Sequence, residues 1–347
     1  MEEERKPALL ISGILLGTCK AENAWQGPAA FYKTAGVDHL ALHVFQGNTA
    51  LSLNNRSDLE GGLQTLTHIA AGFLRNFGAV PHIAVGVKHG SPCSAAVSYI
   101  STLDAVKKMI ACRPEAIFGG TVIANFAIDG EDADALSYHK QKRGRRILDV
   151  VAAAHITPCA RKILERADDR CRFLENREIE GGGAIRLDTA PLIKYARGEI
   201  QVQSNYTFVF DRRHPSVETY GRIDEEEWKD IVLAWAIGST SPSNTITLVR
   251  GGMVVANSGG QHDRRVAVKA AILIADDVGH ATKGAVAYSD SFFPFDDGPR
   301  LLVKAGIATT FTTTGSVRDK EVLGFIRENG TKLVTIPDAK GRGFFGS

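Results

Sequence analysis

The pattern of apolar and polar residues along the chain predicts strands that alternate with helices. Short uncharged runs rich in Val, Ile and Ala, such as 83–87 and 246–249, have the length of buried strands. A longer stretch at 59–77 has apolar side chains three or four positions apart, which is typical of an amphipathic helix. This alternation is characteristic of an α/β protein.

The predicted elements fall into two groups. The segment Glu180-Gly181-Gly182-Gly183-Ala184 separates them and indicates a flexible domain boundary, so we expect units at 1–183 and 184–347. A chain of 347 residues suffices for two domains with full cores. The other expected helices are 101–111, 158–167, 224–237 and 266–275, and the other expected strands are 116–125, 148–152, 171–174, 206–210 and 253–256.

An adjacent lysine and histidine stand where the strand 83–87 ends. Lys88 and His89 place a cation and a base at one point, and Gly90 and Pro92 are expected to end the strand pairing. Ligands of open α/β sheets bind at strand ends, and a histidine there titrates near neutral pH. The residues alone equally allow a structural role, with His89 capping the strand and Lys88 facing solvent.

Composition and charge narrow the class of protein. The 41 basic and 39 acidic side chains give a net charge of +2, which argues against the concentrated basic face of a nucleic-acid-binding protein. The one basic run, 139–146, is interpreted as a solvated loop or an anion contact. Five widely spaced cysteines without a CxxC motif predict neither disulfides nor a cysteine-rich zinc site, which suits the reducing cytoplasm. The charged N-terminus and the short apolar run 8–16 predict no signal peptide and no membrane span.

Two polar clusters follow predicted strands and helices of the second group. Asn244 lies just after a helix, where an asparagine by default bonds its own backbone in a turn. The glycine pair 259–260 precedes Arg264 at the start of the helix 266–275. Free amide groups and the helix dipole favour an anion at such a position.

Two further segments combine glycines or aromatic residues with polar neighbours. In Phe118-Gly119-Gly120 the glycines either permit close backbone approach or form a bulge. The segment 289–297 places three phenylalanines between carboxylates. It indicates either a pocket for a flat ring or a strand end inserted into the core.

These segments occur in the order and approximate spacing of one family. The chain resembles the transformylase half of the bifunctional purine enzyme AICAR transformylase/IMP cyclohydrolase. The matching segments are Lys88-His89 with Ser91-Pro92, Phe118-Gly119-Gly120, Ser243-Asn244, Gly260-Gln261 with Arg264, Asp290 through Phe295, Glu22-Asn23 with Gln26, Ala30-Phe31-Tyr32, Leu51-Ser52 with Asn54-Asn55 and Asp58, and Gly315-Ser316 with Asp319. The resemblance covers nearly the whole chain and leaves no part of it for a cyclohydrolase domain.

The resemblance implies a fold and an assembly. The family has two tandem cytidine-deaminase-like α/β/α units, and an intertwined homodimer draws each active site from both subunits. A deaminase fold raises the alternative of zinc-dependent deamination, which needs an HxE-type motif and a PCxxC motif. Pro92 and Cys93 are followed by Ser94-Ala95-Ala96 without a second cysteine, so no zinc is expected.

The resemblance also implies a reaction. A formyl group passes from 10-formyltetrahydrofolate, the co-substrate, to the 5-amino group of AICAR and gives FAICAR in de novo purine biosynthesis. This amine is a poor nucleophile, so the reaction needs proton removal and a stabilised tetrahedral intermediate. His89 is assigned as general base, Lys88 stabilises negative charge or protonates the departing folate nitrogen, and Asn244 bonds the formyl oxygen or orients the amine.

The same resemblance assigns the binding residues. Those on the nucleotide side are Lys20, Asn55, Asp58, Gly119, Gly120, Arg264 and Arg342, and those on the folate side are Phe292, Pro294, Phe295 and Asp297.

Two cationic positions of the family pattern are altered. Cys19-Lys20-Ala21 stands where the family has Arg-Tyr-Gly, and Ser239 stands where it has a lysine. A lysine is a point charge and cannot replace the bidentate fork of an arginine. Two alternatives therefore stay open, a formyltransferase that acts on a different amine and a non-catalytic ligand-binding homologue. Formyl phosphate stays open as the formyl donor.

Overall fold

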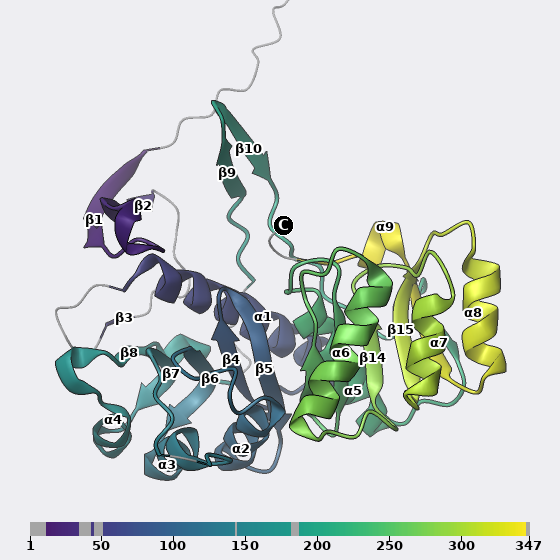
Figure 1. Ribbon diagram of the computed structural model, residues 1–347, viewed down its shortest axis with the longest axis horizontal. Helices are drawn as coiled ribbons and strands as arrows, with labels where there is room; N and C mark the ends of the chain where they lie inside the picture. The colour runs from purple at the N-terminus through teal and green to yellow at the C-terminus, as the bar shows by residue number, and fades with distance from the viewer. Residues whose placement is uncertain (1–11, 35–42, 45–50, 143, 182–186, 345–347) are drawn as a thin grey trace, which may run out of the picture.

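The structure is a computed structural model that describes residues 12–34, 43–44, 51–142, 144–181 and 187–344. Twelve strands in the described part form one mixed sheet in the order β11-β16-β15-β14-β12-β13-β5-β4-β6-β7-β8-β3. Helices cover both faces of this sheet (Figure 1). The predicted α/β class is confirmed.

Residues 53–175 form the part that we call the first half. Its strand order is β5-β4-β6-β7-β8, with β4 antiparallel to both neighbours and the pairs β6–β7 and β7–β8 parallel. Its elements are α1 (Leu53–Phe77), β4 (His82–Lys88), β5 (Ser91–Ser98), α2 (Thr102–Cys112), β6 (Thr121–Ile128), α3 (Gly130–Tyr138), β7 (Val150–Ile156), α4 (Pro158–Leu164) and β8 (Arg172–Glu175).

Residues 225–341 form the second half and repeat this arrangement. The strand order is β13-β12-β14-β15-β16, with β12 antiparallel to both neighbours and the next two pairs parallel. The elements are α5 (Glu225–Gly238), β12 (Ile246–Arg250), β13 (Met253–Asn257), α6 (Arg264–Val278), β14 (Val286–Ser289), α7 (Asp297–Lys304), β15 (Thr309–Thr314), α8 (Asp319–Glu328), β16 (Lys332–Pro337) and α9 (Asp338–Gly341).

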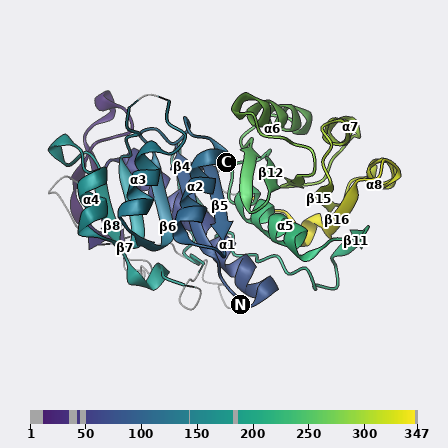
Figure 2. The ribbon, with the colours of Figure 1, turned by 90° about the horizontal axis from the view of Figure 1, so that it is seen from below.

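The two halves meet along a seam where β5 and β13, the outermost strands of their halves, are neighbours in the sheet. Figure 2 shows the two halves on either side of this seam. Met253 pairs with Ala96, and the Val97 amide donates to the Gly252 carbonyl at 2.8 Å. On one face of the sheet α1 packs against α5, and the fully buried side chains of Phe73 and Trp235 belong to one shared core. Burial of these large side chains is the main source of stability at the seam.

Successive side chains of a strand point to opposite faces of the sheet, so the strands contribute to separate cores on the two faces. Ile83, Val85 and Val87 of β4 face the shared core beneath α1, whereas Ala84 between them faces a second core that is covered by α2, α3 and α4. A third core lies under α6, α7 and α8 in the second half and includes Leu248. The period of two along each strand gives both faces of the sheet a separate helical cover.

Two hairpins stand away from these layers (Figure 1). One consists of β1 (Gly13–Cys19) and β2 (Ala29–Thr34), with the 3-10 turn Ala24–Gln26 between them. The other consists of β9 (Leu192–Ala196) and β10 (Glu199–Gln203). Short edge strands complete the sheet, β3 (His43–Val44) beside β8 and β11 (Glu218–Tyr220) beside β16.

Several expected elements are confirmed with shifted ends. The helices expected at 101–111, 224–237 and 266–275 are α2, α5 and α6, and the strands expected at 246–249 and 253–256 are β12 and β13. The helix expected at 59–77 begins earlier, at Leu53, because the Ser52 hydroxyl accepts a hydrogen bond from the Asn55 amide and caps it. The helix expected at 158–167 is α4. It begins at Pro158 as expected but ends earlier, at Leu164.

Other expectations are wrong. Residues 206–210 form no strand, because this segment runs irregularly across the core and inserts the buried Phe210. The strand expected at 116–125 begins only at Thr121, since residues 114–119 form turns. The basic run 139–146 is not a solvated loop throughout. Arg146 is 1% exposed and donates to the carbonyls of Pro114, Leu136 and His139.

Some expectations are not decided by the structure. Residues 182–184 of the expected domain boundary and residues 8–11 of the N-terminal apolar run lie outside the described residues. No helix within the described ranges combines the length and apolarity that a bilayer crossing requires. In the same ranges no three His, Cys, Asp or Glu side chains gather as metal ligands do.

Candidate active site

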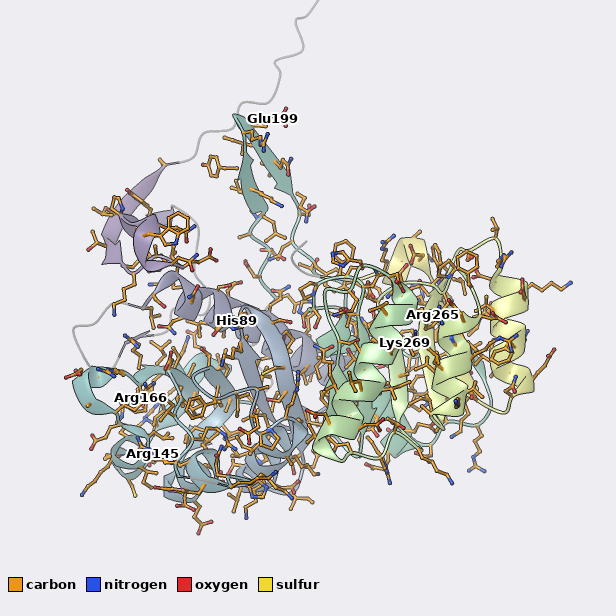
Figure 3. All side chains as sticks on the ribbon, viewed as in Figure 1. His89, Arg145, Arg166, Glu199, Arg265 and Lys269 are labelled. Carbon is orange, nitrogen blue, oxygen red and sulfur yellow. The ribbon has the colours of Figure 1, made fainter. Side chains whose placement is uncertain are left out.

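The Lys88-His89 pair lies at a tight hairpin turn between β4 and β5. Lys88 pairs with Ser91, so His89 and Gly90 are the two turn residues, with φ of 56° and 69°. Two positive φ values are the signature of a type I′ turn. The expectation that Pro92 ends the strand is wrong, because Ser91 and Pro92 are already part of β5. The turn leaves His89 exposed at the end of the strand (Figure 3).

A buried carboxylate of α1 holds this turn. Asp58 Oδ1 accepts a hydrogen bond from the Gly90 amide at 2.7 Å, and Asp58 is only 6% exposed. Gly61 has no side chain because its Cβ would overlap the Gly90 carbonyl. Burial raises the pKa of Asp58, while the Gly90 amide and the charges of His89 and Lys88 act in the opposite direction. The carboxylate is therefore in electrostatic contact with both candidate catalytic side chains.

The same device occurs in the second half with different turn residues. Gly251 and Gly252, with φ of 62° and 74°, connect β12 to β13, and the carboxylate of Asp230 on α5 accepts from both amides at 2.8 and 2.7 Å. Glycine is the residue that such a turn favours. His89 therefore occupies a strained position that the corresponding turn fills with glycine, and such exceptions cluster at functional sites.

Lys88 reaches across to the glycine segment before β6. Its Nζ donates to the Phe118 carbonyl at 2.5 Å. A Cβ on Gly120 would lie 2.6 Å from the Val87 carbonyl, whereas a Cβ on Gly119 would meet nothing within 4 Å. Of the two interpretations of this glycine pair, close backbone approach is the one that the structure bears out at Gly120.

The start of α1 brings two more predicted residues close to this turn. The Asn55 side chain accepts from the Ser52 amide at 3.4 Å and is 7% exposed, one helical turn before Asp58. The Lys20 carbonyl accepts from the Leu53 amide at 3.0 Å, and the Lys20 side chain is exposed. We call Lys20, Asn55, Asp58, Lys88, His89, Gly119 and Gly120 the hairpin cluster.

A second cluster gathers around Asp290, which is fully buried after β14. Its carboxylate accepts from the Ser243 hydroxyl at 2.6 Å and the Thr245 amide at 2.7 Å, and it pairs with the Arg264 guanidinium. Arg264 is itself only 9% exposed. The pair thus fixes the loop that carries Asn244, and in this structure Arg264 is committed to a carboxylate.

Asn244 does not bond its own backbone as a turn asparagine would. Its Nδ2 donates to the Gln261 carbonyl at 2.9 Å, and the backbones of Asn244 and Gln261 exchange two hydrogen bonds of 3.1 Å. The loop before β12 is thereby tied to the loop before α6. Within the described part of the chain no donor contacts the side-chain carbonyl oxygen of Asn244, so this oxygen can accept a hydrogen bond.

Arg342 and Phe292 lie around another carboxylate, Asp338. Asp338 accepts from the hydroxyls of Ser291 and Thr313 at 2.8 and 2.5 Å, and Arg342 Nη1 lies 3.6 Å from its other oxygen. A Cβ on Gly315 would lie within 4 Å of both Asp338 and Phe292. We call Asn244, Arg264, Phe292, Asp290, Asp338 and Arg342 the loop cluster.

Three predicted folate-side residues lie further along the chain, at the start of α7. Pro294 and Phe295 are exposed, and the Arg318 guanidinium stacks 5.0 Å from the Phe295 ring centre. Asp297 accepts from the Gly298 amide and lies 3.8 Å from Arg265, a residue of α6 (Figure 3). The structure joins these side chains to α6 and α8 and to neither cluster.

The sequence pattern did not single out three residues of this region. The pattern places Asp290 in the segment 289–297 but does not predict that it pairs with Arg264, and it gives no role to Asp338 or Asp149. The Asp149 amide donates to the Gly120 carbonyl at 3.0 Å, and its carboxylate pairs with Arg166 and raises the pKa of Asp58. Each of them follows or precedes a buried strand, which is the only signal that the sequence carries.

The fold and the clusters define an α/β protein that is built from two halves with the same strand order and that gathers a lysine, a histidine and a buried carboxylate at the end of a strand. The family model described as AICARFT/IMPCHase bienzyme matches residues 20–273, and the chain belongs to that family.

Curated relatives with the name bifunctional purine biosynthesis protein PurH agree with this assignment. Those of Anoxybacillus flavithermus, Deinococcus deserti and Deinococcus radiodurans are each 31% identical over 284 residues, which is 82% of this chain. The aligned region is 50% of the first relative and 51% of the other two. The chain thus spans about half the length of the curated relatives it matches.

Proposed function

We propose that this chain is a formyltransferase that moves the formyl group of 10-formyltetrahydrofolate to the 5-amino group of AICAR and forms FAICAR. The observation that carries the proposal is the Lys88-His89 pair, held on an exposed positive-φ turn by Asp58 and the Phe118 carbonyl. A strained histidine beside a cation and a buried carboxylate is suited to proton transfer.

His89 takes one proton from the amine as the amine nitrogen attacks the formyl carbon. Asp58 lies on the other side of the turn, and its negative charge stabilises the imidazolium that forms. Lys88 stabilises the developing negative charge and delivers a proton to the folate nitrogen as the bond between that nitrogen and the formyl carbon breaks. The Asn244 amide group orients the amine or the formyl oxygen from the second half.

The remaining predicted residues bind the two substrates. Lys20, Asn55, Gly119, Gly120, Arg264 and Arg342 lie on the nucleotide side, and Phe292, Pro294, Phe295 and Asp297 lie on the folate side. Exposed Phe295 offers a flat face to a pterin ring. Arg342 is about half exposed and offers a guanidinium to an anionic group.

The proposal includes the architecture of the family. The repeated strand order supports two tandem cytidine-deaminase-like units at 1–183 and 184–347. The hairpin β9–β10 supports an intertwined homodimer, because it projects from the rest of the chain with Ile193, Tyr195, Ile200 and Val202 exposed. A cytoplasmic location stays a prediction from the cysteine pattern.

A second candidate is a formyltransferase for a different amine. Arg264 is engaged by the buried Asp290, Cys19 stands where an arginine is expected, and Ser239, which stands where a lysine is expected, is completely buried. These observations favour an acceptor with fewer phosphate charges than the ribotide.

The test is an assay of purified full-length protein with AICAR and 10-formyltetrahydrofolate, in which FAICAR and tetrahydrofolate are quantified together. Equal formation of both products supports the proposal. Tetrahydrofolate formed only when another amine is added favours the second candidate. Binding of both ligands without turnover contradicts both and indicates a ligand-binding homologue.

A matched pair of histidines checks the assignment of the base. His89→Ala should abolish product formation. His82→Ala should not, because His82 lies at the opposite end of β4, where its ring contacts Phe126.

A further inference from the structure

The two clusters belong to different halves, so the seam between β5 and β13 sets their relative position. Met253 pairs with Ala96 at this seam, next to the hydrogen bond from the Val97 amide to the Gly252 carbonyl. Towards the site the backbone pairing of β5 with β13 stops. Pro92 of β5 contributes to this, since proline has no amide proton to donate.

A single side chain spans the seam at this place. Asn257, the last residue of β13, donates from Nδ2 to the Pro92 carbonyl at 2.8 Å and to the Ser241 hydroxyl at 2.9 Å. Its Oδ1 accepts from the Thr247 hydroxyl at 2.8 Å. The amide has both donor protons and its oxygen engaged, and the Thr247 bond fixes its orientation.

The two acceptors of Asn257 lie beside the two clusters. Pro92 is part of the strand that begins just after the Lys88-His89 turn, and Ser241 precedes Asn244 in the loop before β12. Ser241 is fully buried and donates its own proton to the Ile237 carbonyl at 2.7 Å, so its oxygen is fixed as well. Asn257 therefore links the strand that follows the Lys88-His89 turn to the loop that carries Asn244.

We infer that Asn257 is a positioning residue that holds the hairpin cluster and the loop cluster in register for formyl transfer. This inference rests on the proposed function, because only a reaction that needs both clusters at once depends on their register. The proposed nucleotide-side residues lie in both clusters, and Asn257 is not one of the proposed binding residues. Loss of the link should consequently lower turnover more than it weakens binding, since small misplacements of reacting groups cost large rate factors.

Asn125 of β6 provides a matched control in the same fold. Its Nδ2 donates to the Pro81 carbonyl at 2.9 Å, and its Oδ1 accepts from the Ile83 amide at 2.7 Å. It thus makes the same asparagine-to-proline link, but at the end of β4 that lies away from Lys88. It is 3% exposed, so its removal tests the structural cost of losing such a link.

The experiment compares Asn257→Ala with Asn125→Ala in the full-length protein. For Asn257→Ala we expect kcat to fall about 10- to 100-fold, with dissociation constants for AICAR and for 10-formyltetrahydrofolate each within about threefold of wild type. For Asn125→Ala we expect kcat within about twofold. If both variants lose turnover equally, or if Asn257→Ala keeps the wild-type kcat, the inference is wrong.

Ser241→Ala is a milder second variant if Asn257→Ala does not fold. It removes one of the two acceptors and leaves the Pro92 link, so we expect a loss of kcat between wild type and Asn257→Ala. Full wild-type kcat in a folded Ser241→Ala protein that has lost the hydrogen bond contradicts the inference.

Hydrogen exchange separates this inference from the proposed function. In Asn257→Ala the amides of residues 86–94 and 241–245 should exchange faster than in wild type, whereas in Asn125→Ala they should not. If wild type fails to form FAICAR, the proposed function is wrong whatever the exchange shows. If wild type is active and the exchange at both segments is unchanged, Asn257 does not hold them.

Discussion

Replacement of His89 by glycine should stabilise the protein and abolish its activity. His89 has a φ of 56°, in the left-handed region that side chains disfavour, and the corresponding turn of the second half has Gly251 at 62°. The fold therefore accepts glycine at this place in a hairpin. A histidine kept at a position where glycine is more stable supports the proposed role of the imidazole in the reaction.

Two opposing effects determine how much His89→Gly changes the free energy of unfolding. A non-glycine residue in the left-handed region costs roughly 1–2 kcal/mol, and histidine lies towards the low end because it is enriched there. Glycine in turn loses about 0.4–1 kcal/mol more chain entropy on folding. The net expectation is that His89→Gly raises the free energy of unfolding by up to about 0.6 kcal/mol. His89→Ala keeps the strain and should leave that free energy nearly unchanged or lower.

Urea unfolding tests the predicted gain in stability, and product formation tests the predicted loss of activity. The midpoint should rise for His89→Gly relative to His89→Ala, with equal slopes against urea. Both variants should lose at least about 100-fold in kcat, and AICAR binding should be retained. Near-normal turnover of either variant would refute the assignment of the base. A lower midpoint for His89→Gly than for His89→Ala would refute the strain argument.

Three other changes test further parts of the structure. Gly120→Ala should destabilise the protein by roughly 1–3 kcal/mol and lower kcat, because its Cβ would lie 2.6 Å from the Val87 carbonyl; unchanged unfolding and kinetics would contradict this. Asp290→Asn should cost about 3–5 kcal/mol in urea unfolding, since it leaves the Arg264 charge buried without its partner; a neutral effect would show that the pair is not needed. Burial raises the pKa of Asp132 to about 6, so the folded state binds more protons than the unfolded state between about pH 4 and 6 and stability falls as pH rises through that window. Asp132→Asn should flatten this part of the stability profile, and an unaltered slope would contradict the shift.

The elements that the sequence predicts correctly are those whose length and apolar pattern depend on neighbouring residues alone. The helix α5 and the strands β12 and β13 have the length and apolar pattern that their own residues dictate, and their positions were correct within two residues. The segment 206–210 was mistaken for a strand because its residues alternate. Phe210 is buried there by contacts with Trp228, Trp235 and Phe311, all distant in sequence.

The candidate site was predictable to a smaller extent. Lys88 and His89 are neighbours in sequence and were identified with their strand end, but the turn that exposes His89 depends on Asp58, 31 positions before it. The engagement of Arg264 depends on Asp290, and no local pattern predicts that a charge will be buried beside a partner. Side chains that act through distant partners can be assigned roles from a resemblance, but their pairing follows only from the fold.

The two halves share a structural feature that the sequence pattern does not predict, the contact between a helix carboxylate and a hairpin turn. In both halves a carboxylate in the second turn of a helix holds a hairpin turn: Asp58 accepts from one turn amide, and Asp230 accepts from two. This contact requires only a carboxylate on the helix and two residues with positive φ in the turn. The two halves can therefore share it without any similar stretch of sequence. Both turns satisfy the same backbone geometry, so the histidine of the first turn, together with the lysine before it, is a difference that the backbone does not require. This difference supports the proposed role of the pair in proton transfer.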